Sequence, residues 1–315
     1  MKNKEISILG GTGFIGKNLV NFFLKKGFKV YSTYHKSKPF KHKNLNWFKI
    51  DLRKPNGLKK LFKNKKIVIQ AAATTSGSKT IINHPYVHVT DNAVMNSYIL
   101  RSIFENNISH FIFLSCSVMY PPKKYKQSEK EGNIPNKILD KYFGVGNTKL
   151  YIENMCKFFS RISNTKFTVI RHSNIYGQFD KYDLENSHFF GASITKVLQA
   201  NKFIEVWGDG EEKRDLLHVS DLMNFIQLIL HKQKSNFEIY NVAYSKTYKI
   251  REIIKKIIFY SKKKLKINYN TNKPSIKIST SLNISKAKKI GWQPKISLDQ
   301  GIKITLKEKK NELKK

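Results

Sequence analysis

The sequence predicts an α/β fold: a doubly wound parallel sheet with helices on both faces and a smaller lobe toward the C-terminus. Strand-like and helix-like segments alternate through the first two-thirds of the chain, which favours a parallel sheet built from βαβ units. A glycine-rich turn also joins the first strand to the first helix. The 315 residues are enough for one large α/β unit with a smaller companion.

The first strand and its turn are the most informative segment. The β-branched run Ile6–Leu9 leads into a Gly-x-x-Gly-x-x-Gly turn, and an apolar helix follows. Gly10 allows a tight turn, Gly13 lets a pyrophosphate approach the backbone, and Gly16 lets the helix pack closely on the strand. The free amides and positive dipole end of such a helix attract phosphates. We therefore predict a dinucleotide site formed by Gly10, Thr12, Gly13, Phe14, Ile15 and Gly16.

The remaining elements follow in order. We expect strands at Phe28–Tyr34, Trp47–Ile50, Lys66–Gln70, Phe111–Ser115 and Phe167–Ile170, and helices at Val89–Asn106, Asn147–Arg161 and Arg251–Tyr260. The alternation is interrupted twice, in about 176–214 and in 249–315. We interpret 1–175 with about 215–248 as a Rossmann-type domain. The two interrupting segments then form a substrate lobe over the carboxyl edge of the sheet, where such folds bind ligands.

Composition argues against several other classes of protein. The formal net charge is +37, but few of the 59 basic residues are arginine, and the lysines are spread along the chain. Specific nucleic-acid binding favours clustered Lys and Arg, so we do not expect it. No apolar run approaches the ~20 residues that cross a bilayer, so we expect no membrane association. Cys116 and Cys156 form neither a disulfide framework nor a metal-ligand cluster, and we expect a cytoplasmic protein without a metal.

Ordered motifs along essentially the whole chain resemble the extended short-chain dehydrogenase/reductase superfamily. These motifs are GGTGFIG (10–16), DLR (51–53), QAAA (70–73), FLSCS (113–117), RHSNIYG (171–177), RDLLHVSD (214–221), YNV (240–242) and GWQP (291–294). Within it, segments 183–188 and 206–210 are most similar to GDP-L-fucose synthases, which are GDP-4-keto-6-deoxymannose epimerase/reductases. The resemblance implies an NAD(P)-dependent epimerase/reductase acting on a nucleotide-linked sugar, and a homodimer paired through helices 89–106 and 147–161.

The resemblance also assigns binding roles. On the cofactor side it assigns Asp51, Leu52, Ala71, Ala72, Ala73 and Asn92. On the substrate side it assigns Asn174, Asn186, Ser187, His188, Trp207 and Arg214. The guanidinium of Arg214 would contact the diphosphate of the sugar nucleotide. The second strand ends without a carboxylate that would repel a 2′-phosphate, and His35 and Lys36 follow. NADP is therefore favoured over NAD.

The catalytic positions depart from the superfamily pattern. Its members use a Ser or Thr, and a Tyr followed four residues later by a Lys that lowers the Tyr pKa and anchors the nicotinamide ribose. Here that Lys is Lys149, but Val145 stands at the Tyr position. The Ser/Thr position falls on Cys116, with Ser117 next to it. The histidine that fucose synthases place after the Tyr-Gly turn is also replaced, in the run 177–180.

Three explanations stay open. First, another tyrosine could replace the missing one: Tyr142 could act as the acid/base if the glycines at 144 and 146 break the helix and bring its hydroxyl back over the nicotinamide. Ser117 or Cys116 would then polarise the sugar oxygen. The enzyme could instead be an NAD-dependent epimerase or dehydratase of another nucleotide sugar. Finally, the chain could bind a nucleotide sugar without catalysis. We favour an enzyme, because the cofactor glycines and the substrate-loop residues occur together.

Overall fold

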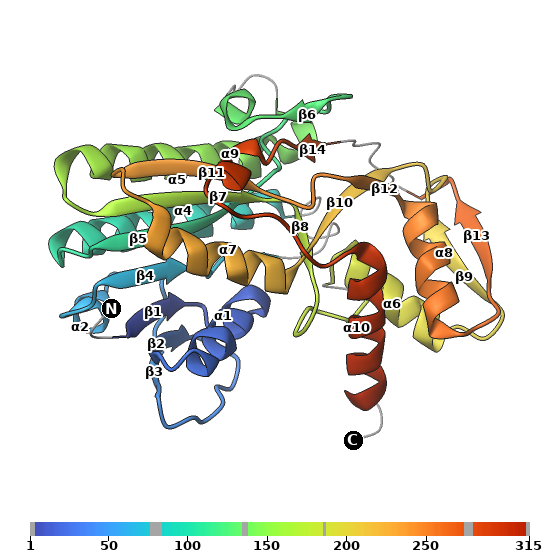
Figure 1. Ribbon diagram of the computed structural model, residues 1–315, viewed down its shortest axis with the longest axis horizontal. Coiled ribbons are helices and arrows are strands. Elements are labelled where there is room, and N and C mark those ends of the chain that lie inside the picture. Colours follow the sequence, from blue (N-terminus) through green and yellow to red (C-terminus); the bar gives the residue numbers. More distant parts are fainter. Residues whose placement is uncertain (1–3, 76–83, 134–137, 185–186, 274–279, 313–315) are drawn as a thin grey trace.

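The computed structural model describes residues 4–75, 84–133, 138–184, 187–273 and 280–312 (Figure 1). Its centre is a seven-stranded sheet in the order β11-β7-β5-β4-β1-β2-β3, and all neighbouring strands in it are parallel. The strands are β1 Glu5–Leu9, β2 Lys29–Tyr34, β3 Leu45–Lys49, β4 Ile67–Gln70, β5 His110–Cys116, β7 Lys166–His172 and β11 Phe237–Val242. This is the doubly wound, Rossmann-type sheet that the sequence predicts.

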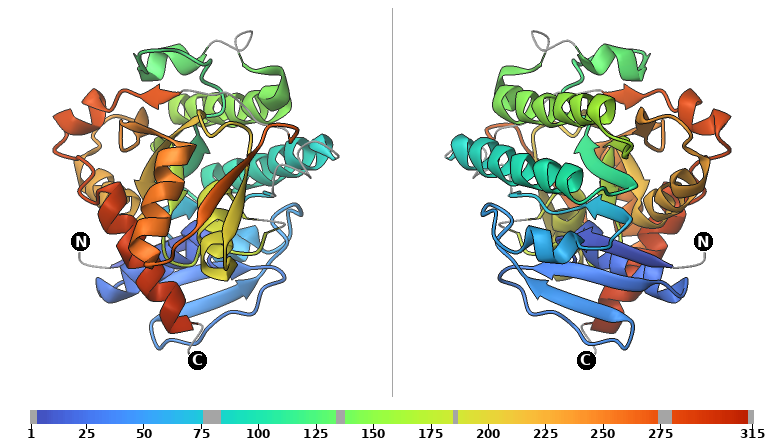
Figure 2. Two further views of the ribbon diagram at one scale, coloured as in Figure 1. Left: turned by 90° about the vertical axis from the view of Figure 1, so that its right-hand side faces the viewer. Right: turned by 90° about the vertical axis from the view of Figure 1, so that its left-hand side faces the viewer.

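Helices cover both faces of this sheet, as the two side views show (Figure 2). One face carries α1 (Phe14–Lys25) and α7 (Val219–Lys232). The other face carries α2 (Leu58–Phe62), α4 (Pro85–Glu105) and α5 (Phe143–Ile162). Because both faces are covered, the central strands are buried along most of their length: the first six residues of β5 are all buried.

Each strand and helix expected from the sequence is present, with ends that differ by a few residues. Helix α5 begins at Phe143, earlier than the expected Asn147. Gly144 and Gly146 lie inside it, so these glycines do not break the helix, and the condition attached above to Tyr142 as acid/base is not met. A Cβ on Gly146 would come 2.9 Å from Cγ2 of Ile138, which means that this glycine allows close packing rather than a bend.

A smaller lobe lies at the carboxyl edge of the sheet, to the right in Figure 1. It contains α6 (Phe189–Gln199), α8 (Ile250–Ser261), α10 (Leu298–Glu312), and the parallel pair β9 (Phe203–Trp207) and β13 (Lys266–Asn270). Buried side chains such as Ile194, Ile253 and Ile302 form its core. A small sheet of β8 (Asn174–Tyr176), β10 (Lys213–His218) and β12 (Thr247–Lys249) leads from the main sheet into the lobe.

One segment expected in the lobe packs on the main domain instead. Strand β14 (Ser281–Leu282) pairs with β6 (Lys126–Gln127), and α9 (Ser285–Lys289) packs beside β11. Trp292 is buried in the main core and donates from Nε1 to the carbonyl of Asp221 at 3.1 Å. The expected span 249–315 is therefore corrected: residues 280–292 return to the main domain because their apolar side chains fill its core.

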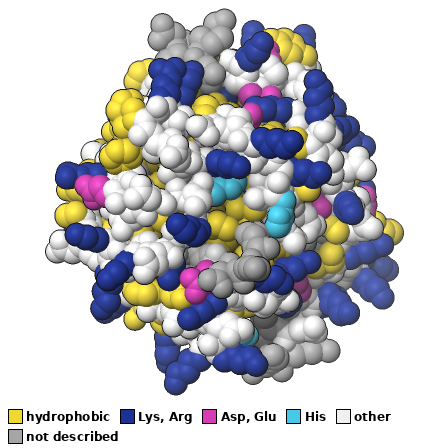
Figure 3. Space-filling view, turned by 60° about the vertical axis from the view of Figure 1, so that its left-hand side comes forward, with side chains coloured by type: hydrophobic (Ala, Val, Ile, Leu, Met, Phe, Trp, Pro, Cys, Tyr) yellow, Lys and Arg dark blue, Asp and Glu magenta, His cyan; other side chains and the backbone are white. Residues whose placement is uncertain are grey.

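On the face drawn in Figure 3, lysine and arginine side chains are spread among the other side chains. Among the described residues, no helix is long and apolar enough to cross a membrane. Within the same part of the chain, no group of three or more His, Cys, Asp or Glu side chains could hold a metal ion.

Candidate active site

The turn between β1 and α1 shows why glycines are needed there. Gly10 has φ +75°, in the left-handed region that favours glycine, and a Cβ on it would come 2.7 Å from Cα of Ala72. A Cβ on Gly16 would come 2.0 Å from the carbonyl oxygen of Gly10. The strand, the turn and the helix therefore approach one another as closely as a dinucleotide-binding turn requires.

The N-terminus of α1 offers donors for an anion. Gly13 is the N-cap and, having no side chain, makes no capping hydrogen bond. The amides of Phe14, Ile15 and Gly16 belong to the first turn, which has no carbonyl partners within the helix. Thr12 lies partly exposed beside them. These amides and the positive end of the helix dipole fit the pyrophosphate of a dinucleotide.

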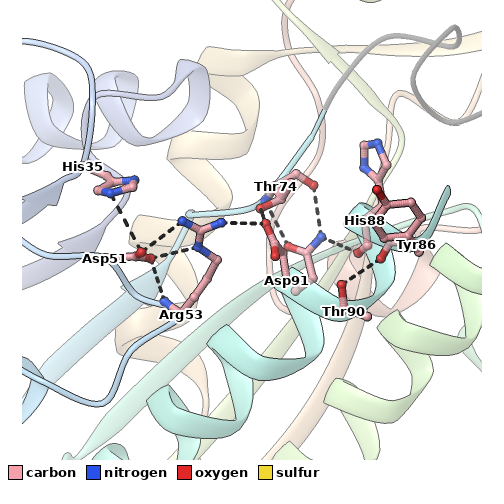
Figure 4. A network of polar contacts seen from close by, with 9 residues as sticks. His35, Asp51, Arg53, Thr74, Tyr86, His88, Thr90 and Asp91 are labelled. Atoms are coloured by element: carbon pink, nitrogen blue, oxygen red, sulfur yellow. Dashed lines mark hydrogen bonds and ion pairs between the residues drawn. The ribbon is translucent and has the colours of Figure 1, made fainter. Parts of the chain in front are cut away.

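A charged network lies after β3, at the other end of the expected cofactor site (Figure 4). Arg53 donates from Nε to Oδ1 of Asp51 at 2.9 Å and from Nη1 to Oδ2 of Asp91 at 3.1 Å. The hydrogen bonds from Arg53 lower the pKa of Asp51 to about 2. Nε2 of His35 lies 3.9 Å from Oδ2 of Asp51, and Leu52 is buried beside them. The residues expected at the adenine and its ribose thus come together.

The small residues after β4 are held against α4. The amide of Ala72 donates to Oε1 of Gln70 at 3.0 Å. Asn92 accepts from the amide of Thr74 at 3.1 Å and donates to the carbonyl of Thr74 at 3.0 Å. Both ends of the Asn92 amide are therefore engaged, and this residue fixes the 71–75 segment, which contains Ala71, Ala72 and Ala73.

The carboxyl ends of β5 and β7 meet where the resemblance puts catalysis. Cys116 and His172 are register partners on these parallel strands, so their side chains leave the same face of the sheet. Lys149 approaches from α5. Its Nζ donates to the carbonyl of Leu114 at 3.2 Å and lies 4.8 Å from the ring centre of Phe113. Cys116, His172 and Lys149 are thus brought together at one edge.

The thiol of Cys116 stays protonated at neutral pH. Burial raises its pKa, although the ammonium of Lys149 acts in the opposite direction. Such a thiol can donate a hydrogen bond but is a poor nucleophile. Ser117, next in the chain, is partly exposed.

Tyr142 stands just outside α5, as its N-cap, at the end of the 3-10 turn Asp140–Tyr142. Burial raises its pKa, and the other groups that shift it are Arg214, Glu212 and Cys116. Lys149 is not among them. The close Lys partner that would favour the Tyr142 phenolate is therefore missing from these groups.

Of the residues expected to bind the substrate, Asn174 lies on strand β8, and Ser187 and His188 lie just before helix α6. Asn174 begins β8, is exposed, and donates from Nδ2 to the carbonyl of Asp215 at 3.2 Å. Ser187 and His188 come directly before α6, and His188 is its N-cap. Asn186 lies outside the described residues.

The other two residues expected to bind the substrate are Arg214, on the small connecting sheet, and Trp207, in the lobe. Nη2 of Arg214 donates to Oε2 of Glu212 at 2.7 Å, so this guanidinium is oriented by a buried carboxylate. Trp207 ends β9. Its ring lies 5.7 Å from Nζ of Lys196 and 5.8 Å from Nζ of Lys273, and these contacts are all within the lobe.

A buried polar network under this edge was not anticipated from the sequence. Arg171 donates from Nε to both carboxylate oxygens of Glu153, and the Ser115 hydroxyl donates to the same carboxylate at 2.5 Å. Nη1 of Arg171 donates to the hydroxyl of Tyr120 at 3.2 Å, which donates to Asn241 at 2.6 Å. The network ties β5, β7, β11 and α5 together. The sequence feature that could have indicated this network is Arg171, which directly follows the predicted strand Phe167–Ile170.

His172 is the second residue that sequence reasoning missed. It ends β7 and its Nδ1 lies 2.7 Å from the carbonyl oxygen of Ser173. Lys149 and His188 are both close enough to shift its pKa. Its signal was a titratable side chain at the carboxyl end of a buried strand, the edge where such sheets bind ligands.

Comparison with known proteins gives a family and several relatives. The family model described as NAD dependent epimerase/dehydratase matches residues 6–243. The GDP-L-colitose synthase of Yersinia pseudotuberculosis is 26% identical over 320 residues, covering 98% of this chain and 100% of that protein. The GDP-L-fucose synthase of Azorhizobium caulinodans is 24% identical over 316 residues and covers 96% of each chain.

Solved structures resemble the whole fold. A UDP-N-acetylglucosamine 4-epimerase from Methanobrevibacter ruminantium, in complex with UDP-N-acetylmuramic acid, superposes with a TM-score of 0.87 at 23% identity, covering 99% of this chain and 100% of that one. The UDP-glucose 4-epimerase of Thermotoga maritima with UDP-glucose gives 0.84, also at 23% identity, over 98% of this chain and 99% of that one. At such identities the likeness is one of fold.

Proposed function

The chain belongs to the NAD dependent epimerase/dehydratase family, and from this premise we propose that it is an NAD(P)-dependent epimerase/reductase of a GDP-4-keto-6-deoxyhexose. Three features carry the proposal: the uncapped α1 N-terminus, Lys149 bonded to the end of β5, and Arg214 on the small sheet that connects the main sheet to the lobe. The GDP-sugar relatives support the choice of nucleotide.

Each residue of the site has a proposed task. When bound, the nicotinamide supplies or accepts the hydride. Lys149 orients its ribose from α5, and Cys116 or Ser117 donates a hydrogen bond to the sugar oxygen. Tyr142 keeps its proton at neutral pH, because burial raises its pKa. The sequence makes its hydroxyl the tyrosine candidate for acid/base work at the same oxygen, but without a Lys partner it is better suited to donate a hydrogen bond there.

The substrate is proposed to lie between the main sheet and the lobe. Arg214, held by Glu212, binds the diphosphate as a bidentate donor. Asn174, Ser187 and His188 face the sugar, together with Asn186 from the segment outside the described residues. Trp207 supplies an aromatic surface in the lobe.

We propose NADP as the preferred cofactor. His35 and Lys36 follow β2 and are both exposed, so a 2′-phosphate can reach them. Asp51 is the nearby carboxylate that would repel this phosphate, and hydrogen bonds from Arg53 partly neutralise it. This arrangement favours an added negative charge more than an unshielded carboxylate would.

We also propose a homodimer in the cytoplasm. Helices α4 and α5 lie side by side (Figure 2). Their outer faces expose Val94, Phe104, Tyr151, Phe158 and Ile162. Such a row of apolar side chains marks an interaction surface. Both cysteines are free thiols, which suits a reducing compartment.

Val145 favours a second candidate function, a binding protein that holds a nucleotide sugar without converting it. The test is a titration with NADPH and NADH in the presence of GDP-, UDP-, CDP- and dTDP-linked sugars, followed by nicotinamide absorbance. NADPH consumption with a GDP-linked keto sugar is the expected result. Binding of both ligands without turnover, and without rearrangement of the sugar by NMR, would support the binding protein instead.

A further inference from the structure

We infer that His172 is the residue that carries the proton to and from the sugar oxygen, the task left open by Val145 at the usual tyrosine position. This inference rests on the proposed function and identifies a catalytic group within it. The resemblance does not assign it. The argument begins with position: His172 and Cys116 are register partners at the carboxyl ends of β7 and β5.

The tautomer of His172 is fixed by its neighbour. Nδ1 lies 2.7 Å from the carbonyl oxygen of Ser173. A carbonyl only accepts, so Nδ1 carries the hydrogen and donates it. In the neutral ring Nε2 therefore has the free lone pair. No described residue forms a hydrogen bond with Nε2, and the ring is only partly buried. A base with an unoccupied acceptor thus stands at the ligand-binding edge.

The groups around the ring keep it neutral. Burial lowers the pKa of His172 to about 4, and the ammonium of Lys149 on α5 and His188 before α6 act in the same direction. On β5 its register partner is Cys116, whose thiol is protonated because burial raises its pKa. No carboxylate is among the groups that shift the pKa of His172. At neutral pH the ring is therefore neutral, and Nε2 keeps its lone pair.

Tyr142 is less suited to this step. Burial raises its pKa, and the positive charge that counteracts this effect is Arg214, which is proposed to bind the diphosphate. Lys149 does not shift it, so the Tyr–Lys pair that lowers a phenol pKa is absent here. Tyr142 is better suited to donate a hydrogen bond than to accept a proton.

The backbone beneath His172 is held firmly. Arg171, the preceding residue, is fully buried and bonded to Glu153 and Tyr120. Glu153 lies one turn after Lys149 on α5. The two sides of the proposed site are therefore joined by one ion pair, which keeps the imidazole and the ammonium in a fixed relation.

The proton step balances in both directions. In the oxidising direction the O–H bond of the sugar carbinol breaks and an N–H bond forms at Nε2, giving an imidazolium. The carbinol C–H electron pair leaves as hydride to an oxidised nicotinamide dinucleotide. In the reducing direction the imidazolium returns its proton to the oxygen, while the carbonyl carbon receives the hydride. Lys149 keeps its proton throughout.

The test compares His172→Gln with Tyr142→Phe, and uses His231→Gln, an exposed α7 position, as the matched control. We expect His172→Gln to lower kcat by 100- to 10,000-fold, a typical loss for a general acid/base. NADPH affinity, measured by fluorescence without any turnover, should stay within about threefold. Tyr142→Phe should lower kcat by less than tenfold, and His231→Gln should behave as wild type.

A second readout does not depend on turnover. In 15N NMR of the wild-type protein, Nε2 of His172 should give a neutral, unprotonated signal at pH 7 that shifts when a nucleotide sugar binds. A bound nucleotide sugar that leaves this signal unmoved, or a His172→Gln variant with full kcat, overturns the inference alone. If no nucleotide sugar binds at all, the proposed function itself fails, and the inference fails with it.

Discussion

Arg171 and Glu153 form an ion pair that is almost completely shielded from solvent, with Nε of the guanidinium 3.1 Å and 3.0 Å from the two carboxylate oxygens. The pair joins β7 to α5 directly under the candidate active site. Removing either partner destabilises the folded protein, because the remaining partner is then a buried charge without a counter-ion.

We predict that Glu153→Gln destabilises the protein by about 3–5 kcal/mol, because Arg171 keeps its charge and loses its counter-ion. Urea unfolding followed by circular dichroism measures this loss. The matched control is Glu105→Gln, which breaks the exposed pair between Arg101 and Glu105 on α4. The control should move the unfolding midpoint little. Equal effects of the two variants would contradict a structural role for the buried pair.

The cofactor turn gives the second prediction. In a Gly16→Ala variant the new Cβ would lie 2.0 Å from the carbonyl oxygen of Gly10, so the turn must move. We expect NADPH binding, followed by fluorescence titration, to be lost. Gly27→Ala is the control, because no atom lies within 4 Å of a Cβ there. Its φ of +78° costs ~1 kcal/mol of stability but should leave binding intact. Unchanged binding in Gly16→Ala would refute the turn as the pyrophosphate site.

Cofactor choice gives the third prediction. Lys36→Glu places a negative charge where the 2′-phosphate is proposed to bind. The Kd for NADPH should rise about tenfold, equivalent to about 1.4 kcal/mol, while the Kd for NADH stays the same. Lys38→Glu, an exposed neighbour with the same change of charge, controls for long-range electrostatics. If both variants weaken NADPH equally, Lys36 has no special place at the phosphate.

A buried histidine gives the fourth prediction, on pH. Burial lowers the pKa of His110 to about 4, and its Nε2 is hydrogen-bonded to Thr168 at 2.8 Å. Between pH 6.5 and 4 the unfolded chain binds the proton and the folded chain does not. The free energy of unfolding therefore falls as the pH falls, by up to about 3 kcal/mol for this group.

The comparison for this fourth prediction is His110→Gln, which keeps polar atoms but cannot titrate. Its unfolding free energy should depend less on pH in this window, by a slope of about one proton, or about 1.4 kcal/mol per pH unit. Parallel pH profiles for the variant and the wild type would show that His110 is not held neutral in the folded state.

The fold was predictable to a different degree in different places. The β1–α1 turn could be read directly because its geometry is mostly local. A Cβ on Gly16 would clash with Gly10 in the same turn, and a Cβ on Gly10 would clash with Ala72 just after the adjacent strand β4. The return of Trp292 to the main core could not be read, because its partner Asp221 is far away in the chain. A Pro- and Lys-rich tail gives no periodic signal that distinguishes one surface from another.

In the candidate site, too, some residues could be predicted from local sequence patterns and others could not. Lys149 could be proposed from its spacing on one helix. His172 could not be paired with Cys116, because their proximity depends on the register of β5 and β7, which no local pattern specifies. The role of Gly146 stayed open for a related reason. A glycine in a helix pattern signals either a break or close packing, and only the position of Ile138 decides between them.

The apolar face of α4 and α5 gives the last prediction. Phe158 is 49% exposed there, beside other exposed apolar residues of the two helices. Exposure of such an apolar patch to water is unfavourable, and a second copy of the chain would cover it. We expect light scattering to find a dimer for the wild type and a monomer for Phe158→Asp. Phe259→Asp on α8 is the control: Phe259 is even more exposed, at 74%, but lies in the lobe, away from this face. A dimer that survives Phe158→Asp and dissociates with Phe259→Asp would place the interface in the lobe. The two-fold axis would then bring together the lobes rather than the helices beside Lys149.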